Sequence, residues 1–127
     1  MKKILVTGCV GFIGYHVCQA LLSQKKFTVI GIDNINNYYD PKIKLERLKN
    51  LNKNKHIKFF NFKRIDIKNN KKIFNIFKKY KFDYVIHLAA QAGVRHSVEN
   101  PKTYVENNIN GFFNILDISR QFKVEHF

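Results

Sequence analysis

Three glycines near the start of the chain are spaced so that they could bind an anion. Gly8, Gly11 and Gly14 follow a short apolar run and precede apolar residues at helical spacing. The first turn of a helix leaves backbone N–H groups unpaired at the positive end of the helix dipole, where a phosphate binds readily. We expect Gly8 to allow a tight turn, Gly11 to let a pyrophosphate approach, and Gly14 to let strand and helix pack closely. The pattern predicts a dinucleotide-binding turn.

An acidic residue lies where a dinucleotide-binding motif has one, at the end of the second strand. Asp33 ends a second apolar run, about 20 residues after the glycines, and an acid there binds the adenosine ribose hydroxyls. A carboxylate in this place repels a 2′-phosphate, so we expect NAD rather than NADP. The alternative interpretation is an ordinary strand-helix turn with a helix-capping aspartate.

One pair of residues resembles a catalytic tyrosine and lysine. Tyr38 and Lys42 are four residues apart, a spacing that places two side chains together only within a helix. Asp40 and Pro41 lie between them and are typical of a helix start, as N-cap and first helical residue. We therefore predict no catalytic residue here, and a loop position for Tyr38.

The histidines and cysteines indicate no other chemistry. His87 lies within an apolar strand and is expected to be a packed group, while His96 lacks an orienting carboxylate at recognisable spacing. Cys9 and Cys18 have neither a spacing nor a histidine partner typical of a metal site, so we expect them to fill space. No metal site is predicted.

The hydrophobic pattern predicts an α/β fold. Strands are expected at about residues 3–7, 27–32, 57–62 and 84–90, and helices at about 12–24, 41–51, 73–80 and 101–122. Residues 124–127 resemble the approach to a fifth strand. We predict a partial Rossmann fold, a doubly wound parallel sheet with strand order 3-2-1-4 that is truncated before the fifth strand. Ligands bind such sheets at the carboxyl ends of the strands, where the strand order reverses.

Length and charge limit the function classes. A chain of 127 residues makes one domain and is short for a complete enzyme of this architecture. The net charge of +14 comes from scattered lysines that accompany many Asn and Ile residues, which favours a tolerant surface over a nucleic-acid site. No apolar run reaches membrane-spanning length, and two thiols suggest a reducing compartment. We expect a cytoplasmic protein with no nucleic-acid or membrane partner.

Taken together, the motifs resemble the extended short-chain dehydrogenase/reductase family of NAD-dependent epimerases and dehydratases. The glycine turn, the Gly31-Ile32-Asp33-Asn34 motif and the block from His87 to Arg95 carry this resemblance, which covers essentially the whole chain. Within the family, the stretches at 36–41 and 107–111 are similar to nucleotide-sugar epimerases, nearest to UDP-glucuronate 4-epimerases of capsule or lipopolysaccharide biosynthesis.

The resemblance implies a set of NAD-binding residues. The three glycines with the amides of Phe12 and Ile13 would hold the pyrophosphate, and Asp33 with Asn34 the adenosine ribose. Asp66 and Ile67 would bind the adenine. The remaining contacts implied, on the nicotinamide side and along the cofactor, are Ala89, Ala90, Gln91, Arg95 and Asn107.

In this family NAD transiently oxidises C4 of the sugar, with a tyrosine as base and a lysine four residues later. Those residues lie beyond the fifth strand in relatives and are missing here. The resemblance therefore implies that residues 1–127 are the NAD-binding half of a Rossmann domain without the sugar-binding and catalytic part. We therefore expect an N-terminal fragment of a 4-epimerase of the UDP-glucuronate or UDP-glucose type, inactive alone.

Two alternatives remain open: a non-catalytic NAD-binding or interaction module, and half of a split epimerase that another chain completes. A UDP-sugar would bind only with a C-terminal half present. The resemblance also implies a homodimer through the helix at 101–122.

Overall fold

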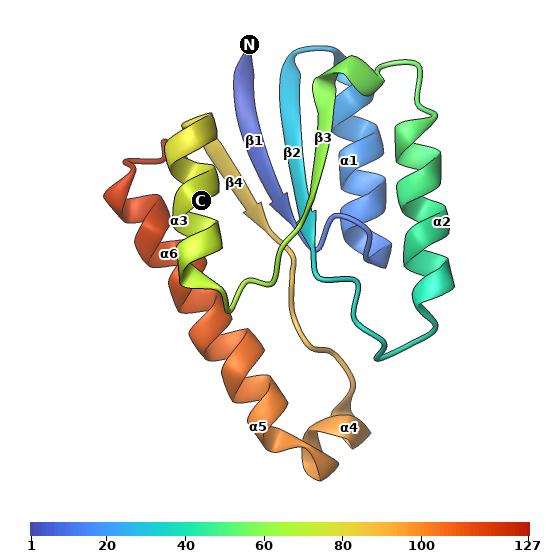
Figure 1. The fold of residues 1–127 in the computed structure, drawn as a ribbon, viewed down its shortest axis with the longest axis vertical. Coiled ribbons are helices and arrows are strands. Elements are labelled where there is room, and N and C mark those ends of the chain that lie inside the picture. Colours follow the sequence, from blue (N-terminus) through green and yellow to red (C-terminus); the bar gives the residue numbers. More distant parts are fainter.

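The computed structural model describes residues 1–127 as parallel strands that alternate with helices (Figure 1). The strands are β1 (Lys2–Thr7), β2 (Phe27–Asp33), β3 (Phe60–Arg64) and β4 (Tyr84–His87). The helical elements are α1 (Phe12–Gln24), α2 (Pro41–Asn52), the 3-10 turn η1 (Ile57–Phe59), α3 (Asn70–Tyr80), α4 (Val94–Glu99), α5 (Pro101–Tyr104), the π-helical segment η2 (Val105–Gly111) and α6 (Phe112–Gln121).

The four strands form one sheet in the order β3-β2-β1-β4, and every pairing is parallel. The predicted fold class and strand order are therefore confirmed. Because β1 lies between β2 and β4, the chain reverses its direction of travel across the sheet at β1. The loops that follow β2 and β4 therefore diverge at the carboxyl end of β1, and this is where a crevice opens in sheets of this kind.

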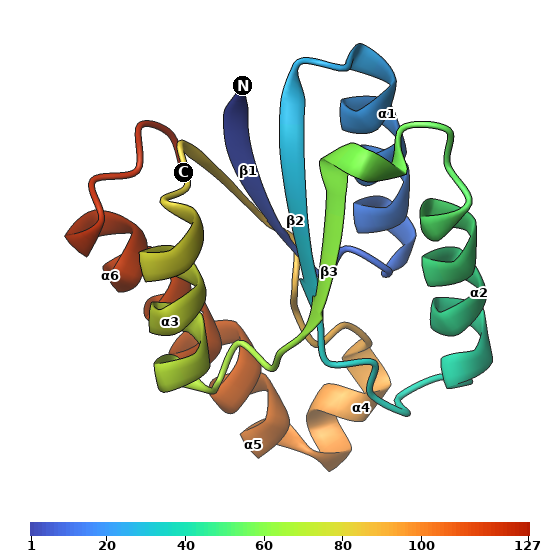
Figure 2. The same cartoon turned by 45° about the horizontal axis from the view of Figure 1, so that its top comes forward.

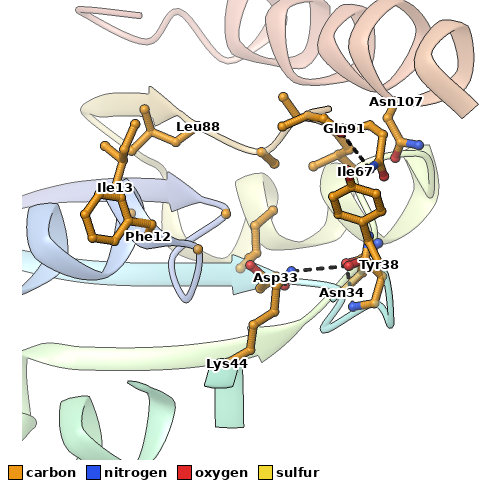
Figure 3. Close-up of a pocket in the computed structure, with 18 of the residues that line it drawn as sticks. Phe12, Ile13, Asp33, Asn34, Tyr38, Lys44, Ile67, Leu88, Gln91 and Asn107 are labelled. Carbon is orange, nitrogen blue, oxygen red and sulfur yellow. Dashed lines mark hydrogen bonds and ion pairs between the residues drawn. The ribbon is translucent and has the colours of Figure 1, made fainter. Parts of the chain in front are cut away.

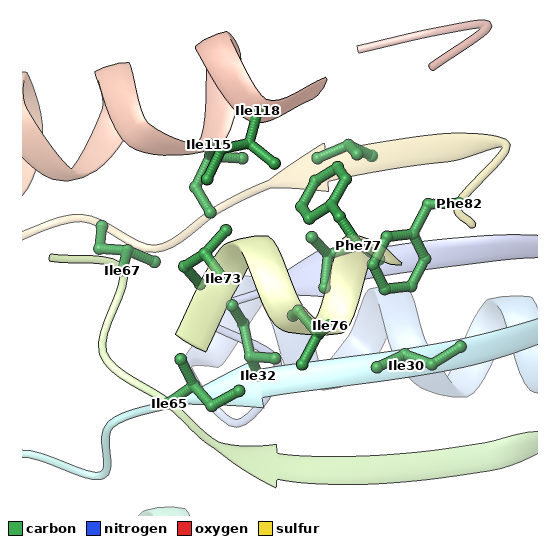
Figure 4. Packing of buried hydrophobic residues seen from close by; sticks show 12 residues of the cluster. Ile30, Ile32, Ile65, Ile67, Ile73, Ile76, Phe77, Phe82, Ile115 and Ile118 are labelled. Atoms are coloured by element: carbon green, nitrogen blue, oxygen red, sulfur yellow. The ribbon is translucent and has the colours of Figure 1, made fainter. Parts of the chain in front are cut away.

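Helices cover both faces of the sheet (Figure 2). Successive residues of a strand point to opposite faces, so Ile4 and Val6 pack toward α1 and α2, while Leu5 packs toward α3 and α6. Figure 4 shows the second of these layers, in which Ile73 and Phe77 of α3 meet Ile115 of α6 over the strands. Strands buried on both faces account for the unalternating apolar runs of the sequence.

Side-chain caps fix where two helices begin. The carboxylate of Asp40 accepts a hydrogen bond from the backbone N–H of Lys42 at 2.9 Å, and Pro41 is the first residue of α2, as predicted. Asn69 caps α3 in the same way, by accepting from the N–H of Lys72 at 3.0 Å. Each cap satisfies a backbone donor that the helix itself leaves free.

Two predicted strands have different bounds. The third was expected at 57–62, but Ile57–Phe59 form a 3-10 turn and β3 begins at Phe60, where its pairing with Val29 starts. The fourth was expected to reach residue 90 but ends at His87. Its neighbour β1 ends at Thr7, opposite His87, so no strand backbone is available to pair with residues 88–90.

The predicted helix at 101–122 is helical but not uniform. It comprises α5, the π-helical η2 and α6 in succession. The preceding short helix α4 was not predicted. It ends at Glu99 because Asn100 precedes Pro101, and the residue before a proline is disfavoured in helical conformation.

The predicted approach to a fifth strand is present as a single parallel bridge between Tyr84 and His126. The N–H of Val85 donates to the carbonyl of His126 at 3.0 Å. No helix has the length and apolar character needed to cross a membrane.

Candidate functional site

A cleft of about 650 Å³ opens at the carboxyl ends of the strands (Figure 3). This volume lies within the range of small-molecule sites, roughly 300–1,000 Å³. The turn after β1 lies at one end, with Phe12 and Ile13. Asp33 and Lys44 line one wall, and Leu88, Gln91 and Asn107 line the opposite wall. A second, more polar hollow of about 560 Å³ adjoins it and shares Asn34, Asn36, Tyr38, Gln91 and Asn107 with it.

The glycine turn has the close packing that its spacing predicted. Gly8 has a φ of +67°, a conformation that favours glycine, and a Cβ there would lie 2.9 Å from the backbone nitrogen of Ala89. A Cβ on Gly14 would overlap the carbonyl oxygen of Gly8 and lie 2.8 Å from its carbon. A Cβ on Gly11 would meet only that same carbonyl oxygen, at 3.1 Å. The space beside Gly11 therefore belongs to the cleft, whereas Gly8 and Gly14 are enclosed by backbone.

Asp33 ends β2 and is buried against a lysine of α2. Its Oδ1 accepts from the N–H of Ile35 at 2.7 Å and lies 3.2 Å from Nζ of Lys44. The two charged side chains are 4% and 10% exposed. Sequence reasoning missed Lys44, although its spacing with Leu48 and Leu51, at i, i+4 and i+7, places it on the inward face of α2.

The loop after β3 is tied to the loop after β2 and to helix α6. Asn34 donates from Nδ2 to Asp66 at 3.3 Å, and Asp66 also accepts from the N–H of Lys68 at 2.8 Å. Asn114 of α6 donates to the carbonyl of Ile67 at 3.0 Å. These bonds hold the backbone of residues 66–68 beside the cleft.

The loop after β4 is held by polar side chains from two other elements. The hydroxyl of Thr7 accepts from the N–H groups of Leu88 and Ala89, both at 3.0 Å. Asn108 of η2 accepts from the N–H of Gln91 at 2.8 Å and donates to its carbonyl at 2.9 Å. The loop that forms this wall of the cleft is thereby held at residues 88 and 89 and again at residue 91.

The cleft brings together most of the residues that the sequence indicated. It is lined by Gly8, Gly11, Phe12, Ile13, Gly14, Asp33, Asn34, Ile67, Ala89, Ala90, Gln91 and Asn107. Asp66 lines the adjoining hollow. Arg95 is exposed on α4 and lines neither. Lining residues that the sequence did not indicate include Tyr39, Ile43, Lys44 and Arg47.

The tyrosine, histidine and cysteine side chains considered for catalysis or metal binding are occupied by packing or hydrogen bonds within the fold. Tyr38 packs its ring 5.0 Å from that of His96, and Lys42 lies in the first turn of α2, after the Asp40 cap. Burial lowers the pKa of His87, whose Nδ1 lies 2.8 Å from the hydroxyl of Thr7. Both cysteines are buried and unpaired, and burial raises the pKa of Cys18 to about 12, as expected for thiols that fill space.

Comparison with known proteins identifies the family. The family model for GDP-mannose 4,6 dehydratase matches residues 5–127. The chain belongs to this family. Among its curated relatives, Protein CapI of Staphylococcus aureus is 44% identical over 98% of this chain, and a UDP-glucuronate 4-epimerase of Thermodesulfobacterium geofontis is 46% identical over the same share. The resemblance to epimerases of the UDP-glucuronate type is thus confirmed.

Solved structures of epimerases in the family have the same fold. A UDP-glucuronic acid 4-epimerase from Bacillus cereus, in complex with UDP-glucuronic acid and NAD, superposes on 98% of this chain with a TM-score of 0.84 and 37% identity. The chain covers 39% of that structure, and 36% and 38% of the two curated relatives. It therefore corresponds to the N-terminal part of these longer proteins.

Proposed function

We propose that residues 1–127 are the NAD-binding half of a nucleotide-sugar 4-epimerase of the UDP-glucuronate type. The cleft carries this proposal, because it joins an enclosed glycine turn, an aspartate at the end of β2 and the polar walls of two further loops in one crevice of suitable volume. Relatives with 44–46% identity include a UDP-glucuronate 4-epimerase, and the similar Bacillus cereus enzyme contains NAD.

The residues of the cleft suit a dinucleotide. The turn at Gly11 leaves room for a pyrophosphate, and the start of α1 supplies unpaired N–H groups. Asp33 would accept from the adenosine ribose, Asp66 would pair with the adenine amino group, and Ile67 would pack the ring. Asn34 would join Asp33 at the ribose. The loop of Ala89, Ala90 and Gln91 would line the nicotinamide side, with Asn107 as a further contact.

NAD, when bound, supplies a hydride acceptor for C4 of the sugar. These 127 residues contribute binding and orientation but no pair of tyrosine and lysine on one helix face. We therefore expect them to bind NAD without epimerising a sugar.

The proposal extends to self-association. The helical run from α5 to α6 buries Ile115 and Ile118 against the sheet, but it exposes a second apolar stripe on another face. Ile109 and Phe113 are each 60% exposed and Leu116 is 40% exposed, at spacings of four and three residues. Because exposed apolar stripes of this kind mark interfaces, we propose that two copies associate through them.

Thermal unfolding with and without NAD tests the binding proposal. NAD at about 100 times its dissociation constant should stabilise the folded chain by roughly 2.7 kcal/mol. Gly11→Val, which fills the space for the pyrophosphate, and Asp33→Ala should each abolish this shift. Lys72→Ala, at an exposed position of α3, should retain it. An unfolding transition that millimolar NAD leaves unchanged would show that the chain does not bind the cofactor.

A further inference from the structure

A buried lysine changes the charge of the part of the cleft wall in which Asp33 lies. Nζ of Lys44 lies 3.2 Å from Oδ1 of Asp33, and the lysine as a whole is 8% exposed. Both Lys44 and Asp33 line the cleft. The expectation from sequence, that the carboxylate of Asp33 repels a 2′-phosphate, did not include this lysine beside it.

The contacts of Asp33 direct one carboxylate oxygen into the cleft. Oδ1 is occupied by two protein donors, the ammonium of Lys44 and the N–H of Ile35. Oδ2 accepts no bond from the protein, yet the chain contains no fully enclosed polar side-chain atom without a partner, so Oδ2 keeps some exposed surface in a residue that lines the cleft. Ile35 has a φ of +51°, which is uncommon for a β-branched residue. This costly conformation holds its amide on Oδ1 and keeps Oδ2 outward.

Lys44 is in turn held by its own neighbours. Its ammonium lies 3.4 Å from Oδ1 of Asn36 and 5.4 Å from the centre of the Tyr39 ring. Arg47, one turn further along α2, also lines the cleft and donates to the carbonyl of Val10 at 3.2 Å. Two cations of α2 therefore line the cleft, and Lys44 is the one in contact with Asp33.

The geometry points to Lys44 as the residue that positions Asp33 to bind the two hydroxyls of a ribose. It also makes Lys44 the residue that would bind a 2′-phosphate once the charge of Asp33 is removed. With the carboxylate present, Lys44 holds Oδ1 and leaves Oδ2 to accept from a ribose hydroxyl, which a 2′-phosphate cannot donate. With the carboxylate neutralised, the same ammonium is free to bind a 2′-phosphate, because charge-assisted bonds to phosphate are strong. This inference rests on the proposed NAD binding.

Calorimetric titration of the full 127-residue chain with two probes tests it. ADP-ribose and 2′-phospho-ADP-ribose differ only at the ribose, so the nicotinamide end of the cleft does not enter the comparison. Asp33→Asn should raise the affinity for the 2′-phosphorylated probe about tenfold, the effect of one charge-assisted bond. Adding Lys44→Met to this variant should remove most of that gain. Adding Lys42→Met, which removes the same charge from an exposed position of α2, should leave it.

The single variants distinguish the positioning of Asp33 by Lys44 from a general effect of removing one positive charge. Lys44→Met should weaken ADP-ribose binding about tenfold, because Asp33 loses the contact that orients it. Lys42→Met should change it less than twofold, and Lys44→Arg should restore part of the loss. If Lys44→Met does not fold, as judged by circular dichroism, Lys44→Arg measures the effect of Lys44 on ADP-ribose binding. The comparison of Asp33→Asn with and without Lys44→Met still tests the phosphate contact, since that double variant lacks both charges of the pair and leaves no buried charge unpaired.

The outcomes distinguish this inference from the proposed function. If the wild-type chain binds ADP-ribose but Lys44→Met behaves like Lys42→Met, Lys44 does not position Asp33. If the gain of Asp33→Asn survives in the double variant with Lys44→Met, Lys44 does not bind the phosphate. A wild-type chain that binds neither probe overturns the proposed function itself, and this inference with it.

Discussion

The hydroxyl of Thr7 shows how one side chain can join a strand to the wall of a site. It is fully buried at the end of β1, accepts two N–H groups of the loop after β4, and lies 2.8 Å from Nδ1 of His87. Because the two amides use its lone pairs, its hydrogen points to His87, whose Nδ1 must be unprotonated. Burial lowers the pKa of His87 and thus favours this neutral form.

Replacing Thr7 tests whether this network stabilises the fold. Thr7→Val keeps the shape but leaves the amides of Leu88 and Ala89 without their acceptor, so we expect a loss of about 2–4 kcal/mol in the free energy of unfolding. Thr7→Ser keeps the hydroxyl and should lose about 1 kcal/mol, for one methyl group. Urea denaturation measures both. Equal losses in the two variants would mean that the methyl group, rather than the hydroxyl, is what matters.

At the scale of an element, the π-helical segment η2 sets the far wall of the cleft. Wider helical turns of this kind are rare and occur frequently at functional sites. Here the segment spans Val105–Gly111 and presents two consecutive asparagines to the site. Asn107 lines the cleft, and Asn108 makes both of its hydrogen bonds with the backbone of Gln91. The element therefore contributes a lining residue and a brace.

Removal of the brace should loosen the wall without unfolding the chain. Asn108→Ala eliminates both bonds to Gln91, so we expect NAD to bind about tenfold more weakly, because the loop must then be ordered on binding. Asn110→Ala, in the same segment but exposed and without a side-chain hydrogen bond, is the matched control and should bind NAD like the wild type. Calorimetry with NAD distinguishes the two. Similar affinities in both variants would show that Asn108 has no such role.

The elements could be predicted where local chemistry decides them, and not where distant partners do. The Asp40 cap and the glycine turn followed from residue types and spacing, and the strand order followed from the Rossmann architecture that the glycine turn indicates. The end of β4 could not, because it depends on where β1 ends. Lys44 was overlooked because lysines are normally exposed, although its position on the helix stripe indicated burial.

At the scale of the whole molecule, the two sides of the α5–α6 run differ in what they contact. One side completes the core over β4 and α3, and Figure 1 shows α6 beside α3 on that face of the sheet. The other side carries Val105, Ile109, Phe113 and Leu116, all exposed. A helix that covers a sheet needs only one apolar face. The second face therefore requires its own explanation, and association of two copies supplies one.

Charged substitutions on this stripe test the association. We expect the wild-type chain to sediment at twice its single-chain mass of 15.0 kDa at high concentration and to dissociate on dilution. In the double variant Ile109→Glu with Phe113→Glu, two carboxylates would be buried without partners, which should raise the dimer dissociation constant by about 100-fold or more. The matched control is Val94→Glu with Val98→Glu, the same number of charges at the same spacing on α4, where the side chains are 85% and 79% exposed. Because this control lies outside the stripe, it should still dimerise. A wild-type chain that stays monomeric at every concentration, or a stripe variant as dimeric as the control, would rule out this surface as the interface.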